Sequence, residues 1–347
     1  MLRPFDAVLL IAFGGPQAPA DVRPFLENVL RGRRVAPGRI DEVAHHYDVV
    51  GGRSPITELT MNQAAGLQTR LSDAGMPLPV YVGMRNWHPF LADTLAKMSR
   101  DGVRRAVGVI AAAHRSYSSC TQYRENVAEA RQALAHQGLA DVEVTYVGDW
   151  HAHPMFVEAG ADRLRAAIAS LDPSLREQAQ ILFTAHSIPE SMAARYPYAA
   201  QFEESAHLIM QRLTENEIEA ARRSTDPFAG AFVFDTYHSY SAVYQSRSGR
   251  PEDPWLGPDI SDVVRQMAVE KVPAVVVSPI GFVCDHVEVL FDLDVEAAAV
   301  AREGNLPFAR ALAVNDHPRF LDMLADVVLQ VCQRYRRARP LELVATP

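Results

Sequence analysis

The run Ala274-Val-Val-Val-Ser278 is followed directly by Pro279-Ile-Gly-Phe-Val-Cys-Asp-His-Val-Glu-Val-Leu-Phe-Asp-Leu-Asp-Val-Glu296. The first run is short, apolar and rich in β-branched residues, which predicts a buried strand. Pro279 and Gly281 mark the end of that strand, and the residues after them predict a helix. In α/β proteins the carboxyl end of a parallel strand is where ligands bind, so this stretch places a candidate site at the strand's end.

Acidic residues recur through the predicted helix at a spacing that puts them on one side of it. They stand at positions i, i+3, i+7 and i+11: Asp285, Glu288, Asp292 and Glu296. Asp294 adds a fifth carboxylate, and no Lys or Arg occurs between Lys271 and Arg302, so the local sequence offers no counter-charge. One interpretation is a solvated acidic face. The position directly after a buried strand favours the other, which is the handling of cations or protons.

The same alternation of strand and helix runs through both halves of the chain. Strands are predicted at residues 7–13, 79–83, 106–113 and 142–147 in the first half, and at 180–185, 231–235 and 274–278 in the second. This order predicts an α/β fold with two Rossmann-like domains, parallel sheets flanked by helices, and an active-site cleft between them. We expect the domains to be residues 1–150 and 151–347, with the metal-handling residues in the second.

Composition narrows the classes of function. The 347 residues carry a formal net charge of −8, which argues against nucleic acid as a partner. Three scattered cysteines cannot supply the four thiolates of an iron–sulfur cluster. An early Asp6 and the lack of any stretch of about 18 apolar residues predict neither a signal peptide nor a membrane span. The expectation is a soluble, cytoplasmic monomer.

Three histidines stand where strands or crossovers end. His186 follows the predicted strand 180–185, where an imidazole suits proton transfer or metal ligation, although a structural role is the alternative. His151 and His153 are interpreted as polar surface residues. The long loop 244–259 contains Trp255 and is expected to be functional, because loops of that length in compact domains usually are.

Several segments resemble the signature segments of ferrochelatases. They are Phe13-Gly-Gly-Pro16, Gly51-Gly-Arg-Ser-Pro-Ile56, Gly83-Met-Arg-Asn-Trp-His-Pro89, Thr184-Ala-His-Ser-Ile-Pro189, Trp255-Leu-Gly-Pro258 and Pro279-Ile-Gly-Phe-Val-Cys-Asp-His-Val-Glu288. The resemblance runs in order from about residue 6 to residue 335. It implies the two-domain chelatase fold and a lyase that inserts ferrous iron into a porphyrin in haem biosynthesis, with release of two protons. Fe2+ is then a substrate, and no tightly bound cofactor is expected.

The resemblance also implies roles for single residues. His186 and Glu288 are the expected catalytic pair and metal ligands, and Asp292 and Glu296 extend them as a route for metal or protons. Porphyrin contacts are expected from the following residues: Phe13, Arg31, Arg33, Ser54, Tyr123 and Trp255. The two arginines would meet propionates. Many bacterial relatives have tyrosine where this chain has Phe13, so a tyrosinate ligand to iron is excluded at that position.

Substrate identity stays open between branches of the family. A coproporphyrin III ferrochelatase is expected, because four propionates suit a cleft that bears arginines. A protoporphyrin IX ferrochelatase is the alternative, and a cobalt or nickel chelatase shares the fold but usually has more histidines. A different class is a non-catalytic haem or metal carrier, which would tolerate loss of Glu288.

Overall fold

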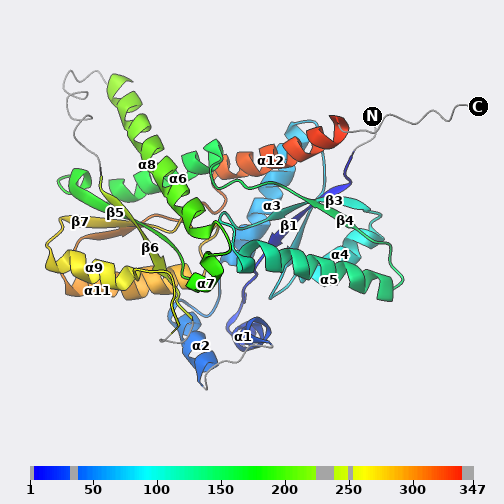
Figure 1. The fold of residues 1–347 in the computed structure, drawn as a ribbon, viewed down its shortest axis with the longest axis horizontal. Helices are drawn as coiled ribbons and strands as arrows, with labels where there is room; N and C mark the ends of the chain where they lie inside the picture. Colours follow the sequence, from blue (N-terminus) through cyan, green and yellow to red (C-terminus); the bar gives the residue numbers. More distant parts are fainter. Residues whose placement is uncertain (1–3, 32–37, 224–237, 249–252, 338–347) are drawn as a thin grey trace, which may run out of the picture.

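The computed structural model describes residues 4–31, 38–223, 238–248 and 253–337 (Figure 1). Within these residues no helix is long and apolar enough to cross a membrane. Two β-sheets lie side by side, each with helices on both of its faces. The predicted α/β fold with two parallel sheets is confirmed.

Within the described part of the chain, both sheets have four parallel strands in the same spatial order. The first sheet runs β2 (Val80–Met84), β1 (Ala7–Ala12), β3 (Arg105–Ile110) and β4 (Glu143–Tyr146). The second runs β6 (Tyr240–Gln245), β5 (Ala179–His186), β7 (Ala274–Ser278) and β8 (Phe308–Arg310). Each half therefore repeats the other in topology, as the sequence pattern predicts.

One predicted strand was misplaced. The segment 231–235 lies outside the described residues, and the strand that occupies the place of β2 in the second sheet is β6, at 240–245. Its first two residues are exposed and only its last three are buried, so no continuous apolar run marks it, and its end falls inside the predicted loop 244–259. Pairing with β5 gives this short segment its strand conformation.

The helices have the following bounds. They are α1 (Val22–Leu30), α2 (Arg39–Val49), α3 (Ile56–Asp73), α4 (Leu91–Arg100), α5 (Gln122–His136), α6 (Pro154–Ala169), α7 (Glu190–Ala193), α8 (Tyr198–Arg223), α9 (Ile260–Val269), α10 (Val287–Val289), α11 (Ala298–Glu303) and α12 (Pro318–Arg337). Short 3-10 turns occur at Pro19–Asp21 and Arg176–Gln178, and π-helices at Tyr117–Thr121 and Leu290–Ala297.

Burial on both faces explains why the central strands are apolar throughout. In β1, alternate side chains enter two cores, with Leu10 in the core under α3 and α12 and Leu9 in the core under α4 and α5. In β5, Phe183 packs beneath α6 and α8, and Leu182 packs beneath α9 and α11. Such continuous apolar strands are typical of parallel sheets that are covered on both sides.

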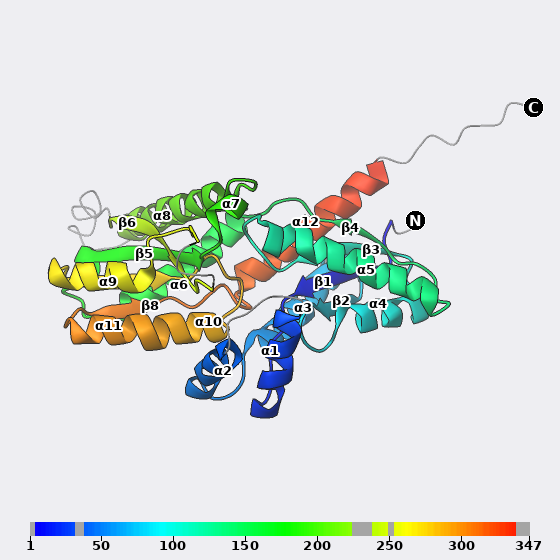
Figure 2. The same ribbon diagram turned by 60° about the horizontal axis from the view of Figure 1, so that its bottom comes forward.

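The last helix crosses back to the first half of the molecule. α12 packs on α3, α6 and β3, and Phe320 and Leu324 belong to the core of the first sheet. Figure 2 shows α12 running from the second half toward the first. The boundary at residue 150 remains a prediction, but residues 318–337 complete the first core although they follow the second sheet in sequence.

Candidate active site

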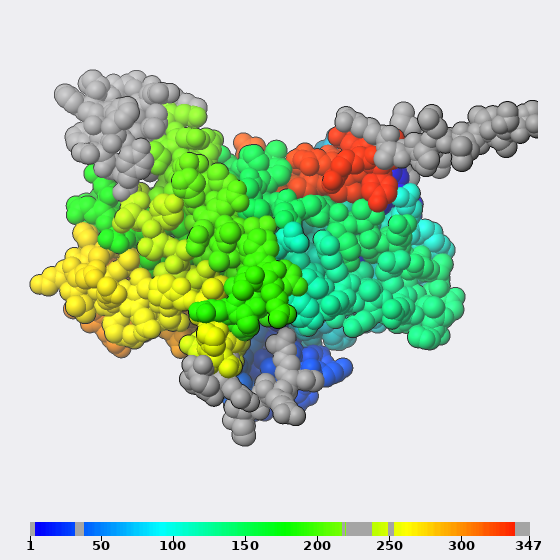
Figure 3. Space-filling view, viewed as in Figure 1, coloured from blue at the N-terminus to red at the C-terminus, as the bar shows by residue number. Residues whose placement is uncertain are grey.

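A cleft of about 910 Å³ is lined by residues just past the carboxyl ends of six strands. These residues follow β1, β2 and β3 of the first sheet and β5, β6 and β7 of the second: Gly14, Arg85, Ala112, Ser187, Ser246 and Gly281. α1 and α2, blue in Figure 3, form a separate lobe below the two halves and contribute Phe25 and Tyr47 to the lining. The volume suits a cofactor-sized ligand.

His186 is the last residue of β5, and its position is fixed from three sides. Its carbonyl accepts a hydrogen bond from the hydroxyl of Tyr198 at 2.9 Å, and Ser187 next to it donates its backbone N–H to the carbonyl of Gln245 at 2.8 Å. The Nδ1 of His186 contacts the carbonyl oxygen of Ser187. A carbonyl can only accept, so Nδ1 carries the hydrogen. The Nε2 atom then presents a lone pair whenever the ring is neutral.

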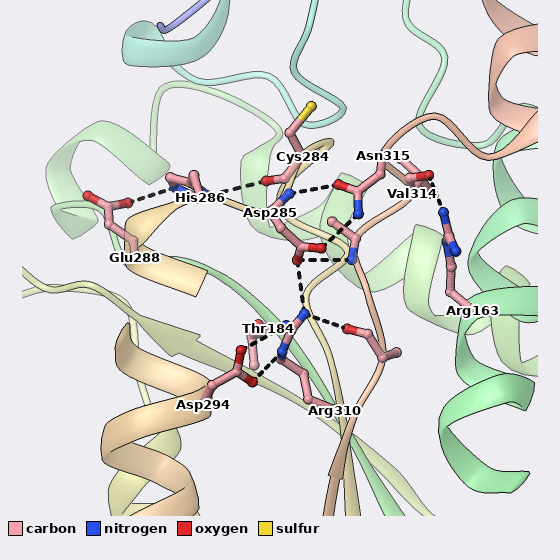
Figure 4. Close-up of polar contacts among 12 residues, drawn as sticks. Arg163, Thr184, Cys284, Asp285, His286, Glu288, Asp294, Arg310, Val314 and Asn315 are labelled. Carbon is pink, nitrogen blue, oxygen red and sulfur yellow. Dashed lines mark hydrogen bonds and ion pairs between the residues drawn. The ribbon is translucent and has the colours of Figure 1, made fainter. Parts of the chain in front are cut away.

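A second histidine repeats this arrangement beside the same carboxylate (Figure 4). The Nδ1 of His286 lies 3.2 Å from the carbonyl of Cys284, so it too carries the hydrogen. The Oε2 atom of Glu288 lies 3.3 Å from Nε2 of His286 and 3.7 Å from Nε2 of His186. With neutral rings, three lone pairs would converge at Glu288. The arrangement is favourable only when a proton or a cation sits among them.

The pKa of Glu288 reflects this surrounding. Burial in the cleft wall acts to raise the pKa, but the adjacent His186 and His286 outweigh burial and hold the Glu288 pKa at about 2. Its carboxyl group is therefore ionised at neutral pH, and it retains 41% of its side-chain exposure toward the cleft. An ionised acceptor that faces two imidazoles can receive a proton or ligate a metal.

Asp292 lies one turn beyond Glu288, and its pKa is shifted in the opposite direction. Burial raises the pKa of Asp292 to about 7, helped by the charges of Glu288 and Glu296 and opposed by hydrogen bonds from Ser246 and Gln245. The Ser246 hydroxyl and the Gln245 amide, at 3.3 Å, both donate to Oδ2 of Asp292. Ser246 has a φ of 61°, in the left-handed region that non-glycine residues rarely adopt, which often marks functional sites.

Glu288, Asp292 and Glu296 form a continuous row along the cleft wall. Asp292 and Glu296 belong to the π-helix 290–297, a rare conformation that is frequent at functional sites. The pKa of Glu296 is raised by burial and by the charges of Asp259 and Glu42. Three carboxyl groups, one with a lowered pKa and two with a raised pKa, thus lead away from the histidine pair.

The other two acids of the stretch do not belong to this row, which corrects the sequence interpretation. Asp285 precedes the helix and Asp294 faces away from the cleft, and both pair with the guanidinium of Arg310. The local sequence offered no counter-charge, but β8 supplies one because it lies next to β7 in the sheet. These two acids are structural.

Most of the residues that were expected to contact porphyrin line the cleft: Phe13, Ser54, Tyr123 and Trp255. Phe13 packs edge-on against Phe25, with ring centroids 6.2 Å apart. Arg31 is exposed, its guanidinium binds the side chain of Asn28 at 2.6 Å, and it is not among the lining residues. Arg33 lies outside the described residues.

The structure also brings cations to the cleft that the sequence interpretation missed. Arg39, Arg85 and Arg247 line it, and the guanidinium of Arg85 lies 5.8 Å from the ring centre of Tyr123. Arg85 directly follows β2, and this position at the end of a strand was the signal that the sequence offered. Arg39 begins a separate helix, and no local pattern connected it to the site.

The interpretation of His151 and His153 as surface residues was wrong. Their side chains are 13% and 14% exposed, and each binds a carboxylate on another helix, Glu204 on α8 and Asp326 on α12. The Nδ1 of His153 also accepts the backbone N–H of Met155 and so caps α6. Both histidines therefore connect the start of α6 and the segment before it to neighbouring helices.

No preformed metal site of three or more His, Cys, Asp or Glu side chains exists within residues 4–31, 38–223, 238–248 and 253–337. Two sheets that open onto one cleft, with a histidine pair on a carboxylate and an acidic row behind it, define a chelatase-type α/β protein. The ferrochelatase family profile matches residues 5–331, and the chain belongs to this family of enzymes, which insert metal into a porphyrin.

Curated relatives agree with this assignment. The coproporphyrin III ferrochelatase of Streptomyces griseus is 44% identical over 94% of this chain and 85% of the relative, and that of Mycolicibacterium smegmatis is 41% identical over 93% and 89%. A ferrochelatase of Rhodopirellula baltica is 42% identical over 94% and 86%. The solved structure of SirB from Bacillus subtilis with Fe3+ shares the fold, with a TM-score of 0.55 at 10% identity over 96% of this chain and 97% of that one.

Proposed function

We propose that this chain inserts Fe2+ into coproporphyrin III. The observation that carries the proposal is the pair of imidazole Nε2 atoms that face one oxygen of Glu288 inside the cleft. Relatives above 40% identity that are named coproporphyrin III ferrochelatases support the porphyrin. So do three cleft arginines, because guanidinium groups bind carboxylates such as propionates.

The protons that insertion releases must be accepted by groups in the cleft, and this requirement gives His186 and Glu288 their roles. Insertion forms bonds from iron to four nitrogens and releases two pyrrole N–H protons for each Fe2+ that enters. When its ring is neutral, His186 keeps the hydrogen on Nδ1 and has a free Nε2 lone pair, which can accept the first proton. Glu288, ionised and beside it, stabilises the imidazolium that forms and offers an oxygen to iron before transfer.

Asp292 and Glu296 continue the route. The Asp292 carboxyl, with a pKa of about 7, exists in both protonation states near neutral pH and can take a proton from the Glu288 side and pass it on. Glu296 is exposed at the far end of the row, where protons leave to solvent or hydrated iron arrives. Carboxylate oxygens suit a hydrated divalent cation in transit.

Other residues that line the cleft hold the macrocycle. Phe13 and Trp255 offer aromatic faces, and Tyr123 and Ser54 complete the lining. We place the reaction in haem biosynthesis in the cytoplasm and expect a monomer without an iron–sulfur cluster. Support for the last point is the cysteine set: only three occur, and Cys284 and Cys332 are buried.

The test is anaerobic metallation, followed by absorbance, with Fe2+ and either coproporphyrin III or protoporphyrin IX. We expect faster turnover of coproporphyrin III. We expect His186→Ala to abolish insertion while porphyrin still binds, and Asp141→Asn, in a surface ion pair with Arg131, to behave like the wild type. Turnover that survives in His186→Ala would contradict the role of His186.

A second candidate substrate is protoporphyrin IX. The Rhodopirellula relative, 42% identical, is named a ferrochelatase without any porphyrin in its name. Faster metallation of protoporphyrin IX would therefore replace the coproporphyrin proposal. Tight binding of both porphyrins with metallation of neither would favour a carrier.

A further inference from the structure

Arg310 connects the two acids that the acidic row leaves out. Its side chain is 10% exposed at the end of β8. Its Nε and Nη2 atoms bind the carboxylate of Asp294 in bidentate fashion at 2.5 and 2.8 Å, and its Nη1 binds Asp285 at 2.9 Å (Figure 4). One guanidinium thus holds a residue just before His286 and a residue two positions beyond Asp292.

Asp285 is held from a second side by Asn315. The Asn315 amide donates to Oδ2 of Asp285 at 2.7 Å, and its Oδ1 accepts the backbone N–H of Asp285 at 2.8 Å. The backbone N–H of Ala313 donates to Oδ1 of the same carboxylate at 3.3 Å. Asp285 is 5% exposed, so its charge is matched by buried partners rather than by solvent.

Gln63, from the first half of the molecule, binds the backbone next to Asp285 and at Asn315. This side chain, fully buried on α3, donates to the carbonyl of Asn315 at 2.8 Å and to the carbonyl of Val283 at 3.3 Å. Its amide also lies 3.1 Å from the sulfur of Cys284. The loop that leads into His286 is therefore anchored to both sheets.

We propose that Arg310, with Asn315 and Gln63, is a positioning residue that holds Glu288 against its two histidines. This inference rests on the proposed function. The segment 286–292 carries two carboxylates that repel each other, and it contains no Lys or Arg. Arg310 binds Asp285 before this segment and Asp294 after it, an arrangement that we call the clamp. The clamp keeps Oε2 of Glu288 within 3.3–3.7 Å of the Nε2 atoms of both histidines.

A stabilising role alone would produce a different result. An ion pair that only supported the fold would, when broken, lower stability and leave the balance between kcat and KM unchanged. Loss of a positioning clamp should lower kcat, because the clamp acts on the reacting groups. It should leave the KM for porphyrin nearly unchanged, because other elements form the porphyrin-binding surface. Partners that orient metal-site residues typically cost 10–100-fold in activity or metal affinity when removed.

The test uses Asp294→Asn in the full chain. Asp294 is 38% exposed, so the change leaves no buried carboxylate unpaired, and Arg310 keeps Asp285. Asp141→Asn is the matched control, because Asp141 also binds one arginine in bidentate fashion, at 3.0 and 2.6 Å, away from the cleft. Asn315→Gly is a second variant, since glycine tolerates the φ of 49° and loses both bonds to Asp285.

We expect Asp294→Asn to lower kcat for iron insertion about tenfold, with the KM for porphyrin within about twofold of wild type. Hydrogen–deuterium exchange should quicken at residues 286–297 and stay unchanged in the first sheet. A kcat equal to that of Asp141→Asn, or unchanged exchange at 286–297, would overturn the clamp. Failure of wild type to metallate either porphyrin would overturn the proposed function instead, and the exchange data would still decide whether Arg310 holds this segment.

Discussion

Replacing Asp292 with asparagine should make the protein more stable and less active at the same time. Asparagine has nearly the same shape and can still accept hydrogen bonds from Ser246 and Gln245 through its side-chain oxygen. It cannot ionise, so it removes a charge that burial and two neighbouring carboxylates make unfavourable. The same change removes a proton carrier from the row.

The magnitude follows from linkage between protonation and folding. The pKa of Asp292 is about 7 in the folded protein and 3.8 in its ordinary state. The stability that comes from the protonated form is fully present below about pH 4 and is lost as the pH rises to about 7. At about 1.36 kcal/mol for each pH unit, this amounts to about 4 kcal/mol, and solvent in the cleft reduces it to about 1–3 kcal/mol.

The assay is thermal unfolding of wild type and Asp292→Asn at pH 8 and at pH 4. We expect the variant to unfold about 1–4 °C higher at pH 8, and the two proteins to agree at pH 4. Asp262→Asn on α9, 74% exposed, is the control and should change neither value. Equal melting temperatures at pH 8, or a gain that persists at pH 4, would refute the reasoning about the Asp292 pKa.

Three further predictions test the site and the fold. Glu288→Gln should lower metallation at least about 100-fold and leave porphyrin binding intact, as measured by fluorescence quenching, because it removes the charge that faces both histidines; a carrier would show no such loss. Arg85→Gln should raise the KM for coproporphyrin III about tenfold, because it removes one charge-assisted hydrogen bond to a propionate. A rise in KM for Arg31→Gln but not for Arg85→Gln would instead assign propionate binding to Arg31. Gly281→Ala should cost about 1–3 kcal/mol in thermal unfolding, because its new Cβ would lie 2.5 Å from Ala185; an unchanged melting temperature would contradict this close packing.

The sequence by itself determined the architecture and the centre of the site. Continuous apolar runs such as 7–12 and 274–278 predict strands because burial on both faces removes any polar alternation. His186 was identifiable because it directly follows such a strand, whereas Glu288 was expected as its partner from the resemblance to ferrochelatases. Local signals of this kind can be recognised in a single sequence, because a few neighbouring residues produce them.

Only the tertiary structure decided which acidic side chains pair with which basic ones. The sequence places Asp285 on an acidic stripe and Asp294 near it without a counter-charge, yet Arg310, 16 residues beyond Asp294, neutralises both because β8 lies beside β7. Likewise, α12 completes the core of the first sheet from the far end of the chain. Such pairings join residues distant in sequence. Their energy depends on burial and on separations of a few ångströms, and neither quantity is encoded in local spacing.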